Sequence, residues 1–418
     1  MSTATPPRLL FAGGASPIST SVDISTIALT QARARGIHTH LINRPRSLAA
    51  TPEVNRLADE VTAVDADDPG ACARWVRERA ARGDRFDMVL GLRDTVQLSV
   101  ADAAAVFGAP GNPADAVRRV RNKDACRAAL AAAGFPQPAV RLCASADEAA
   151  AFLADGSGPW VVKPRDAAGS IGVRKVTGVE ELPAAVRALP DPDLFLVEEF
   201  VEGPEYSVEG VFLGGVPKVL AVTAKMKLPP PYFVEIGHVL PAGLPGDVLA
   251  GVEQQVTGAL TALGLRFGVF HAELWLTREG VVLGEVHPRP GGDWIHRLLE
   301  HAVPGLELFG LLFDDLLGRP VNENLTPVRA AASYFLTAPP GRLTRVEGWA
   351  EVAAHPAVLH AELGVRPGDV VGPVRQSADR VGALVVGADS PEQARELALG
   401  LAASVRFEVE PAGGRKYV

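Results

Sequence analysis

Cysteine is scarce in this sequence, and long apolar runs are absent from it. The 418 residues include only three cysteines, Cys72, Cys126 and Cys143, whose spacing matches no metal motif. An odd, unpatterned set of cysteines predicts free thiols in a reducing compartment rather than a disulfide framework. No apolar window reaches the ~18 residues of a membrane span, and the opening MSTATPPRLLFAGG lacks the basic head and apolar core of a signal peptide. We therefore expect a cytoplasmic protein without a membrane partner.

Lysine is also scarce. Lys and Arg total 41 against 49 Asp and Glu, and the net charge of -8 argues against a nucleic-acid partner. Only seven of the 41 basic residues are lysines. Because arginine serves wherever a positive charge suffices, each lysine is a candidate for a task that needs a compact ammonium. The lysines are Lys123, Lys163, Lys175, Lys218, Lys225, Lys227 and Lys416.

The N-terminal part alternates short apolar strands with helical segments. With 47% hydrophobic residues and a length beyond one ordinary core, the chain is expected to fold as several α/β domains. The alternation predicts a doubly wound parallel sheet. Gly13-Gly14, after the first strand, is either a plain turn or a cradle for a phosphate or a substrate carboxylate, and GxGxxG spacing is absent. Strands are predicted at 8–14, 38–42, 61–64 and 86–90, and helices at 22–34, 71–82 and 114–133.

Two acids interrupt apolar runs that flank a turn, Thr277-Arg278-Glu279-Gly280, and these runs predict a β-hairpin. A three-residue loop pairs Thr277 with Val281 and sets Glu273 directly across from Glu285. A loop of two or four residues puts the acids on opposite faces instead. The register therefore decides whether the two carboxylates meet.

Facing carboxylates repel each other unless a cation lies between them. His287 points the same way as Glu285, and Arg289 follows it, so the pattern predicts a site for hard cations that carry phosphate. The alternative is a pair of glutamates on the wet face of an antiparallel sheet.

A glycine-rich loop follows an apolar strand that carries Lys163. The loop contains Gly169, Ser170, Ile171 and Gly172, and a second strand leaves it. Without GK[ST] and a following helix, the segment is not a P-loop. It is either a plain hairpin or a flap whose backbone N–H groups close over phosphates, with Lys163 beneath as a point charge.

A further hairpin contains the sequence EEFVEGPE. It is either an ordinary hairpin or a nucleotide contact, in which Glu198, Glu199, Phe200 and Val201 meet an adenine edge and Glu205 meets ribose hydroxyls.

Taken in order, the helix lysine Lys123, the Lys163 strand with GSIGV, EEFVEGPE and EVHPRPGG resemble the ATP-grasp ligases over residues 114–299. The resemblance implies that Lys123 and Lys163 hold the ATP phosphates and that Glu273 and Glu285 coordinate Mg²⁺, with Mn²⁺ as the alternative. Most members have Asn where this chain has His287, so the number of ions stays open, and His287 either ligates metal or faces phosphate or the nucleophile. The implied parts are an N-terminal α/β domain (1–112), a subdomain with the flap (113–200), a catalytic subdomain with the metal site (201–325) and a C-terminal lobe (326–418).

Residues 223–242, TAKMKLPPPYFVEIGHVLPA, are similar to the substrate loop of carboxylate–amine ligases that join amino acids. The resemblance implies that Glu235 and His238 grip the substrate ammonium or deprotonate the attacking amine. Arg289 would stabilise an acyl phosphate and the tetrahedral oxyanion, and the partners would be a small carboxylate and an amine. The other interpretation of the segment is a proline-rich connector with a solvated acid.

The resemblance leaves the oligomeric state open, although dimers are common in the family. Two rival functions also stay open: a ligase of this fold for purine-type or other carboxylate substrates, and a nucleotide-binding protein without turnover.

After Pro304 the sequence carries no chemical pattern, and we expect this part to cover the back of the sheet. The predicted elements are a helix at 306–317, a strand at 330–337, pieces of a hairpin within 368–386 and a helix from Ser390-Pro391 to Ser404.

Overall fold

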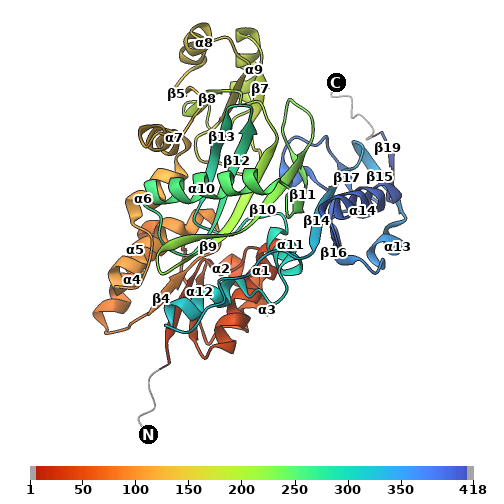
Figure 1. Ribbon diagram of the computed structural model, residues 1–418. Helices are drawn as coiled ribbons and strands as arrows, with labels where there is room; N and C mark the ends of the chain where they lie inside the picture. Colours follow the sequence, from red (N-terminus) through yellow and green to blue (C-terminus); the bar gives the residue numbers. More distant parts are fainter. Residues whose placement is uncertain (1–5, 412–418) are drawn as a thin grey trace, which may run out of the picture.

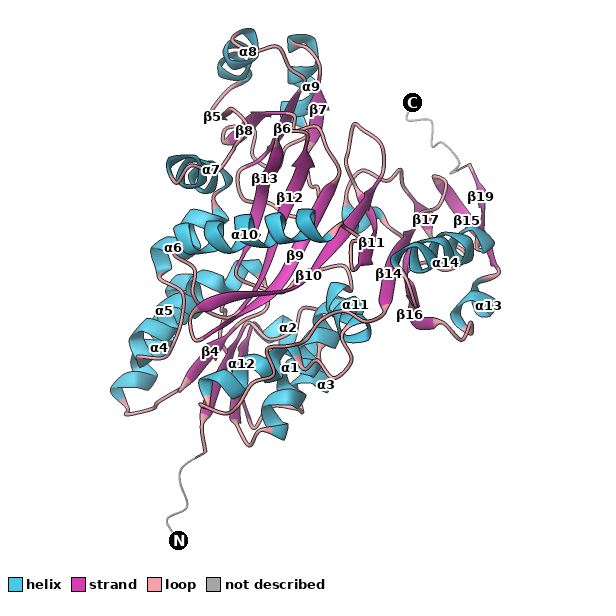
Figure 2. Cartoon of the chain, in the orientation of Figure 1, coloured by secondary structure: helices cyan, strands magenta, loops and turns pink. Residues whose placement is uncertain are grey.

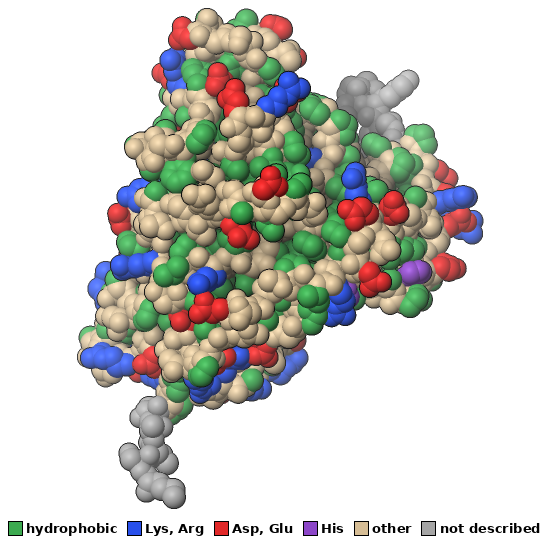
Figure 3. Space-filling model, viewed as in Figure 1, with side chains coloured by type: hydrophobic (Ala, Val, Ile, Leu, Met, Phe, Trp, Pro, Cys, Tyr) green, Lys and Arg blue, Asp and Glu red, His purple; other side chains and the backbone are tan. Residues whose placement is uncertain are grey.

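The computed structural model describes residues 6–411, so Lys416 and the first five residues of the opening stretch lie outside it. An eight-stranded sheet runs through the molecule in the order β13-β12-β9-β10-β11-β14-β18-β16, and three smaller sheets surround it (Figures 1 and 2). No helix within 6–411 has the length and apolar character that a membrane crossing requires. On the face drawn in Figure 3, acidic and basic side chains are interspersed, without a large patch of one charge.

The N-terminal domain is a four-stranded parallel sheet in the order β3-β2-β1-β4, as predicted. Leu9 and Phe11 pack in a core with α1, whereas Leu10 and Ala12 pack in a core with α4 and α5, so both faces are covered. The elements are β1 (Arg8–Ala12), α1 (Ser19–Ala34), β2 (His38–Asn43), α2 (Pro45–Ala50), α3 (Pro52–Asn55), β3 (Glu60–Ala63), α4 (Pro69–Ala81), β4 (Met88–Leu90), η1 (Asp94–Val96) and α5 (Gln97–Phe107).

The single helix predicted at 114–133 is wrong, because two helices occupy it: α6 (Ala114–Arg121) and α7 (Lys123–Ala132). Asn122 between them is extended, with φ -89° and ψ 107°. Asparagine leaves helical geometry at low cost, since its side chain competes for backbone hydrogen bonds. The break makes Lys123 the first residue of α7, and its N–H donates to the Arg165 carbonyl at 3.2 Å.

A small antiparallel sheet, β5-β8-β6-β7, carries the glycine-rich loop between β6 and β7, as predicted. Its apolar face packs on α8 and α9. The elements are β5 (Val140–Cys143), α8 (Ala146–Ala154), β6 (Trp160–Pro164), β7 (Arg174–Val176), η2 (Val179–Glu181), α9 (Leu182–Arg187) and β8 (Phe195–Glu199).

The central sheet is covered by α10 on one face and by α11, α12 and α1 on the other (Figure 1). Val211 and Val269, for example, share a core with Leu298 and Phe309. The elements are β9 (Glu205–Leu213), β10 (Val216–Lys227), β11 (Glu235–Leu240), α10 (Gly246–Ala262), β12 (Val269–Thr277), β13 (Gly280–His287), α11 (Ile295–Ala302) and α12 (Leu308–Leu316).

As predicted, helices after Pro304 pack on the sheet: α12 lies on one face with α11, and α14 packs on β14 and β18 in the C-terminal lobe. The lobe also extends the sheet, because its strands β14, β18 and β16 continue it beside β11 (Figure 2). The hairpin predicted within 368–386 is wrong, because β17 pairs with β15 in a separate sheet while β18 pairs with β14 and β16. Alternation marks a strand but does not specify its partner.

The final helix begins after Ser390, whose hydroxyl accepts from the Gln393 N–H at 3.3 Å, as its sequence predicts. The elements of the lobe are β14 (Ala330–Leu336), β15 (Gly341–Glu347), α13 (Trp349–Ala353), β16 (Val358–Leu363), β17 (Val370–Val371), η3 (Ser377–Asp379), β18 (Gly382–Ala388), α14 (Pro391–Ser404) and β19 (Arg406–Glu410).

Candidate active site

A cavity of about 480 Å³ lies where all four parts of the chain meet. It collects most of the side chains predicted from the sequence, whereas Ile171 and Gly172 do not line it: Ile171 is 39% exposed and Gly172 packs near Leu189 and Pro190. The predicted residues that line the cavity are Lys123, Lys163, Gly169, Ser170, Glu198, Glu199, Phe200, Val201, Glu205, Glu235, His238, Glu273, Glu285, His287 and Arg289.

The β12–β13 hairpin has a two-residue loop, since Thr277 pairs with Gly280. Of the loop lengths that the sequence left open, this is one that by itself would put the two acids on opposite faces. Gly280 permits this tight turn with φ +123°. A bulge farther along the ladder then sets one β12 residue, Glu273, opposite two residues of β13, the second being Glu285. The bulge compensates for the shorter loop, and both carboxylates line the same cavity.

Lys225 lies at the centre of three carboxylates. Its buried Nζ is 2.8 Å from Glu235, 2.9 Å from Glu273 and 3.1 Å from Glu205. Burial acts to lower the pKa of Lys225, but the three acids raise it well above its ordinary value. This part of the cavity therefore holds a cation among oxygen donors.

Two buried residues, Glu209 and His271, form a chain of hydrogen bonds that ends at Glu273. His271 Nδ1 is 3.0 Å from both carboxylate oxygens of Glu209, and its Nε2 is 3.2 Å from Glu273. Although burial opposes it, Glu209 raises the pKa of His271 to about 9. At neutral pH the ring is therefore charged and donates to both acids.

Asp94, at the start of η1, reaches His287 and Arg289, beside the predicted metal ligands, from the N-terminal domain. It accepts from Arg289 Nη2 at 2.8 Å and from His287 Nδ1 at 3.0 Å. His287 Nε2 lies 3.4 Å from Glu285. Burial acts to raise the pKa of Asp94, but Arg289 and His287 hold it well below its ordinary value. Asp94 thus joins two predicted catalytic side chains to a second domain.

Lys163 and Glu198 form a buried ion pair that Arg127 completes. Lys163 Nζ is 2.5 Å from Glu198, and Arg127 donates to the same carboxylate from Nε at 3.0 Å and Nη2 at 3.2 Å. The Glu198 carboxylate therefore binds cations, so only the backbone of Glu198 is available to contact an adenine edge.

Lys123 approaches from α7, and its Nζ donates to the Ala167 carbonyl at 2.8 Å and lies 3.3 Å from Glu285. With Lys163 it supplies positive charge beside the two predicted metal ligands.

The glycine-rich loop is shaped to cover the cavity. Gly169, Ser170 and Gly172 have φ values of 71°, 59° and 69°, in the left-handed region. The Ser170 hydroxyl lies 3.4 Å from the Phe233 carbonyl, so the loop also meets the segment between β10 and β11.

Aromatic rings flank the predicted adenine contact. Phe200 stacks with Phe233 at 5.8 Å between centroids, and Lys175 Nζ lies 3.8 Å from the Phe200 ring centre. Glu205, predicted for ribose, is ion-paired here with Lys225 and Lys227.

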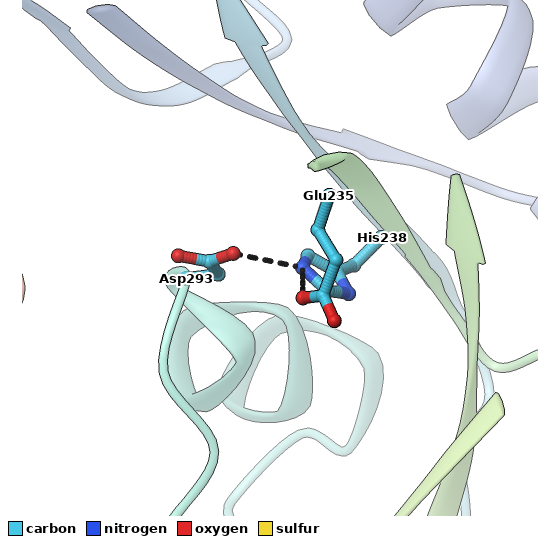
Figure 4. A group of neighbouring side chains, drawn as sticks. All are labelled: Glu235, His238 and Asp293. Carbon is cyan, nitrogen blue, oxygen red and sulfur yellow. Dashed lines mark hydrogen bonds and ion pairs between the residues drawn. The ribbon is translucent and has the colours of Figure 1, made fainter. Parts of the chain in front are cut away.

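Glu235, His238 and Asp293 form a second cluster that lines the cavity and adjoins Glu273 through Lys225 (Figure 4). His238 Nε2 lies 3.2 Å from Asp293 and 3.5 Å from Glu235, and the three ligand atoms could in principle hold a metal ion. Each carboxylate, however, already binds a cation: Lys225 holds Glu235, and Arg380 holds both oxygens of Asp293 at 2.7 Å.

Glu273 and Glu285 are a donor set that fits a hard divalent cation, because carboxylate oxygens are its preferred ligands. The lysines Lys123 and Lys163 and the glycine-rich loop fit the phosphates of a nucleotide in the same space. The two functions meet in one cavity.

Sequence reasoning named Lys225 only among the scarce lysines, without a role, and it missed the roles of Asp94, Asp293, Arg380 and the Glu209–His271 pair. The scarcity of lysine was a signal for Lys225. The others carry no local pattern, and their roles appear only when distant segments come together.

Two family models match this chain: an ATP-grasp domain over residues 157–297 and an L-amino acid ligase C-terminal domain 2 over residues 334–410. The uncharacterized protein y4rH of Sinorhizobium fredii is 30% identical over 379 residues, covering 88% of this chain and 78% of y4rH. A D-alanine–D-alanine ligase of Ralstonia pickettii is 34% identical over 240 residues, covering 54% of this chain and 71% of that ligase. The crystal structure of an L-amino acid ligase from Bacillus licheniformis has a TM-score of 0.79 at 23% identity, covering 98% of this chain and 100% of that one.

Proposed function

Because the chain belongs to the ATP-grasp family of ligases, which form C–N bonds, we propose that it joins the carboxylate of one amino acid to the amine of another. The carboxylate attacks the γ-phosphoryl group of ATP, an acyl phosphate forms and ADP leaves. The amine then attacks the acyl carbon and releases phosphate. The observation that carries the proposal is the presence of a phosphate-type cluster and an adjacent Glu235–His238 cluster in one cavity.

At the phosphate end, Lys123 and Lys163 hold the ATP phosphates, and Glu273 and Glu285 hold Mg²⁺ or Mn²⁺. When bound, the metal neutralises charge on the transferring phosphoryl oxygens. The backbone N–H groups around Gly169 cover the phosphates and exclude water, which would hydrolyse an acyl phosphate.

At the substrate end, Glu235 and His238 grip the substrate ammonium or take the proton of the attacking amine. Arg289 carries a permanent charge and donates through a planar fork, so it stabilises the oxyanion of the tetrahedral intermediate. Asp94 fixes the direction of that fork, because it accepts from Nε at 2.9 Å and from Nη2 at 2.8 Å.

The names of the relatives support amino acids as the substrate class, since both the D-alanine–D-alanine ligase and the L-amino acid ligase are named for them. The L-amino acid ligase model also matches the C-terminal lobe, beyond the ATP-grasp domain. We further propose a cytoplasmic protein whose partners are small molecules, with a homodimer as its assembly.

The test incubates the protein with MgATP and pairs of amino acids, and follows ADP, phosphate and product mass. ADP and phosphate in equal amounts, with a dipeptide that requires both amino acids, are the expected result. AMP in place of ADP would refute the acyl phosphate. ADP release with a purine-type or other carboxylate, and none with amino acids, would replace the substrate class, and no turnover with any carboxylate would reject the function.

A further inference from the structure

Arg380 of the C-terminal lobe reaches the substrate end of the cavity. Its Nη1 and Nη2 each donate to one oxygen of Asp293 at 2.7 Å. Nη1 also donates to the Glu235 carbonyl at 3.0 Å, and the guanidinium lies 3.6 Å from the Phe335 ring centre. The side chain is only 11% exposed. One guanidinium thus joins β11, the segment before α11, and the lobe.

Asp293 links Arg380 to His238, because its carboxylate contacts both side chains. Its Oδ2 lies 3.2 Å from His238 Nε2, whereas Nδ1 of that buried ring has no hydrogen-bond partner among residues 6–411. Asp293 has a left-handed backbone, with φ 52°, which costs conformational energy that its side-chain contacts help to offset. The direction of the His238 ring therefore depends on a carboxylate that Arg380 fixes.

The turn that carries Arg380 also holds the glycine-rich loop. The Ser377 N–H donates to the Gly169 carbonyl at 3.1 Å. Within the same turn, Arg380 Nε donates back to the Ser377 carbonyl at 2.8 Å. Ser377 contacts the loop proposed to cover the phosphates, and Arg380 contacts the substrate cluster. The two residues are three positions apart in the sequence.

We propose that Arg380 is a positioning residue for the amino acid substrates and that the turn Gln376–Arg380 couples closure of the glycine-rich loop to the alignment of Asp293 and His238. The C-terminal lobe then completes the active site. This inference rests on the proposed function for its kinetic part only. Loop closure with the lobe aligned would expose an acyl phosphate to the amine site rather than to water.

The geometry explains why arginine is required at this position. A planar guanidinium binds both oxygens of one carboxylate and keeps a further N–H for the Glu235 carbonyl, which a lysine ammonium cannot do in the same arrangement. Removing Arg380 alone leaves Asp293 buried without its main cation, which could destabilise the fold. A double variant that also neutralises Asp293 removes this buried charge, so a loss of activity that persists in it is due to lost alignment.

The kinetic experiment compares Arg380→Met, Asp293→Asn and the double variant with Arg375→Met, the same change at an exposed arginine of the neighbouring segment. For Arg380→Met we expect kcat/KM for the amino acids to fall roughly 100-fold, while KM for ATP stays within about twofold. Because the two residues act as one unit, the double variant should fall no further than the single ones. An equally large rise of KM for ATP would overturn the positioning role. Additive losses of kcat/KM in the double variant would overturn it as well.

The coupling is tested by hydrogen exchange of residues 166–173 with and without ATP, which needs no turnover. Ser377→Pro removes the N–H that binds Gly169, and the position tolerates proline because it opens a 3-10 helix after an extended Gln376 with φ -150° and ψ 166°. We expect exchange of the loop to rise about tenfold, and Ser377→Ala, which keeps the N–H, to leave it as in the parent protein. Unchanged exchange in Ser377→Pro would overturn the coupling, and raised exchange in a protein that joins no amino acids would reject the proposed function while the coupling stands.

Discussion

The two ends of the cavity are assembled in different ways. At the phosphate end, Glu273 and Glu285 face each other across a single hairpin, and a bulge in that ladder sets their alignment. At the substrate end, His238 comes from the central sheet, Asp293 from the segment before α11 and Arg380 from the C-terminal lobe. The first cluster is specified by short segments of chain. The second forms only when the domains have docked.

Because the two ends are assembled differently, we expect substitutions at each end to reduce turnover in a different way. In the proposed reaction, phosphate-end residues act through charge on the transferring group, so their removal should stop the first chemical step whatever the substrate. Substrate-end residues act through distance and direction, so their loss should weaken turnover in proportion to the misalignment.

Glu285→Gln should give the largest effect. The amide keeps the shape of the side chain but removes the charge that faces Lys123 at 3.3 Å and that we propose for metal binding. We expect kcat to fall at least ~1000-fold in an ADP-release assay, with an unchanged circular dichroism spectrum. Glu279→Gln, at the exposed turn of the same hairpin, is the matched control. Activity within tenfold of the parent would reject the metal assignment.

Asp94→Asn should give an intermediate effect, and it tests whether domain docking serves catalysis. The amide no longer attracts Arg289 and His287 as an anion, so both side chains lose direction. We expect kcat/KM for the amino acids to fall roughly 10- to 100-fold, with KM for ATP nearly constant. Asp102→Asn in α5, outside the cavity lining, is the control. If KM for ATP rose as much as KM for the amino acids, the two ends of the cavity would not differ in the way proposed.

His287→Asn places at this position the residue most family members carry. Imidazole favours transition metals over Mg²⁺, whereas an amide oxygen suits both. If His287 ligates the metal, the ratio of Mn²⁺-supported to Mg²⁺-supported turnover should fall roughly threefold to tenfold in the variant. A constant ratio would assign His287 to orienting Asp94 and Glu285 instead.

The sequence was informative wherever the determinants are local. The parallel sheet, the glycine-rich loop between two strands and the N-cap at Ser390 follow from alternation, glycine spacing and capping. The hairpin shows the limit: the sequence left the loop length open, and with the two-residue loop that forms, the acids share the cavity only because of a bulge that no pattern encodes. Arg380 and Asp94 lie 87 and 195 residues from the side chains they bind, Asp293 and Arg289, and nothing near either of them signals the contact.

The smallest effect concerns the tie between the N-terminal domain and α11. Asp23 of α1 accepts from His296 Nε2 at 2.7 Å and from Arg297 Nη2 at 2.6 Å. Burial acts to raise the pKa of Asp23, but these hydrogen bonds lower it from 3.8 to about 2.

A carboxyl whose pKa is lower in the folded state stabilises the fold above its unfolded pKa, and this stability is lost as the pH falls toward the folded value. Asp23→Asn should therefore cost about 1–2 kcal/mol in urea unfolding near pH 6, and the difference from the parent should shrink as the pH falls through 3.8 toward 2. Turnover per folded molecule should stay close to that of the parent, because Asp23 contacts neither cluster. A difference that is constant with pH would show that the tie does not depend on the charge of Asp23. A large loss of turnover would instead show that the substrate end depends on this tie as well as on Asp94, since both hold the N-terminal domain against the central sheet.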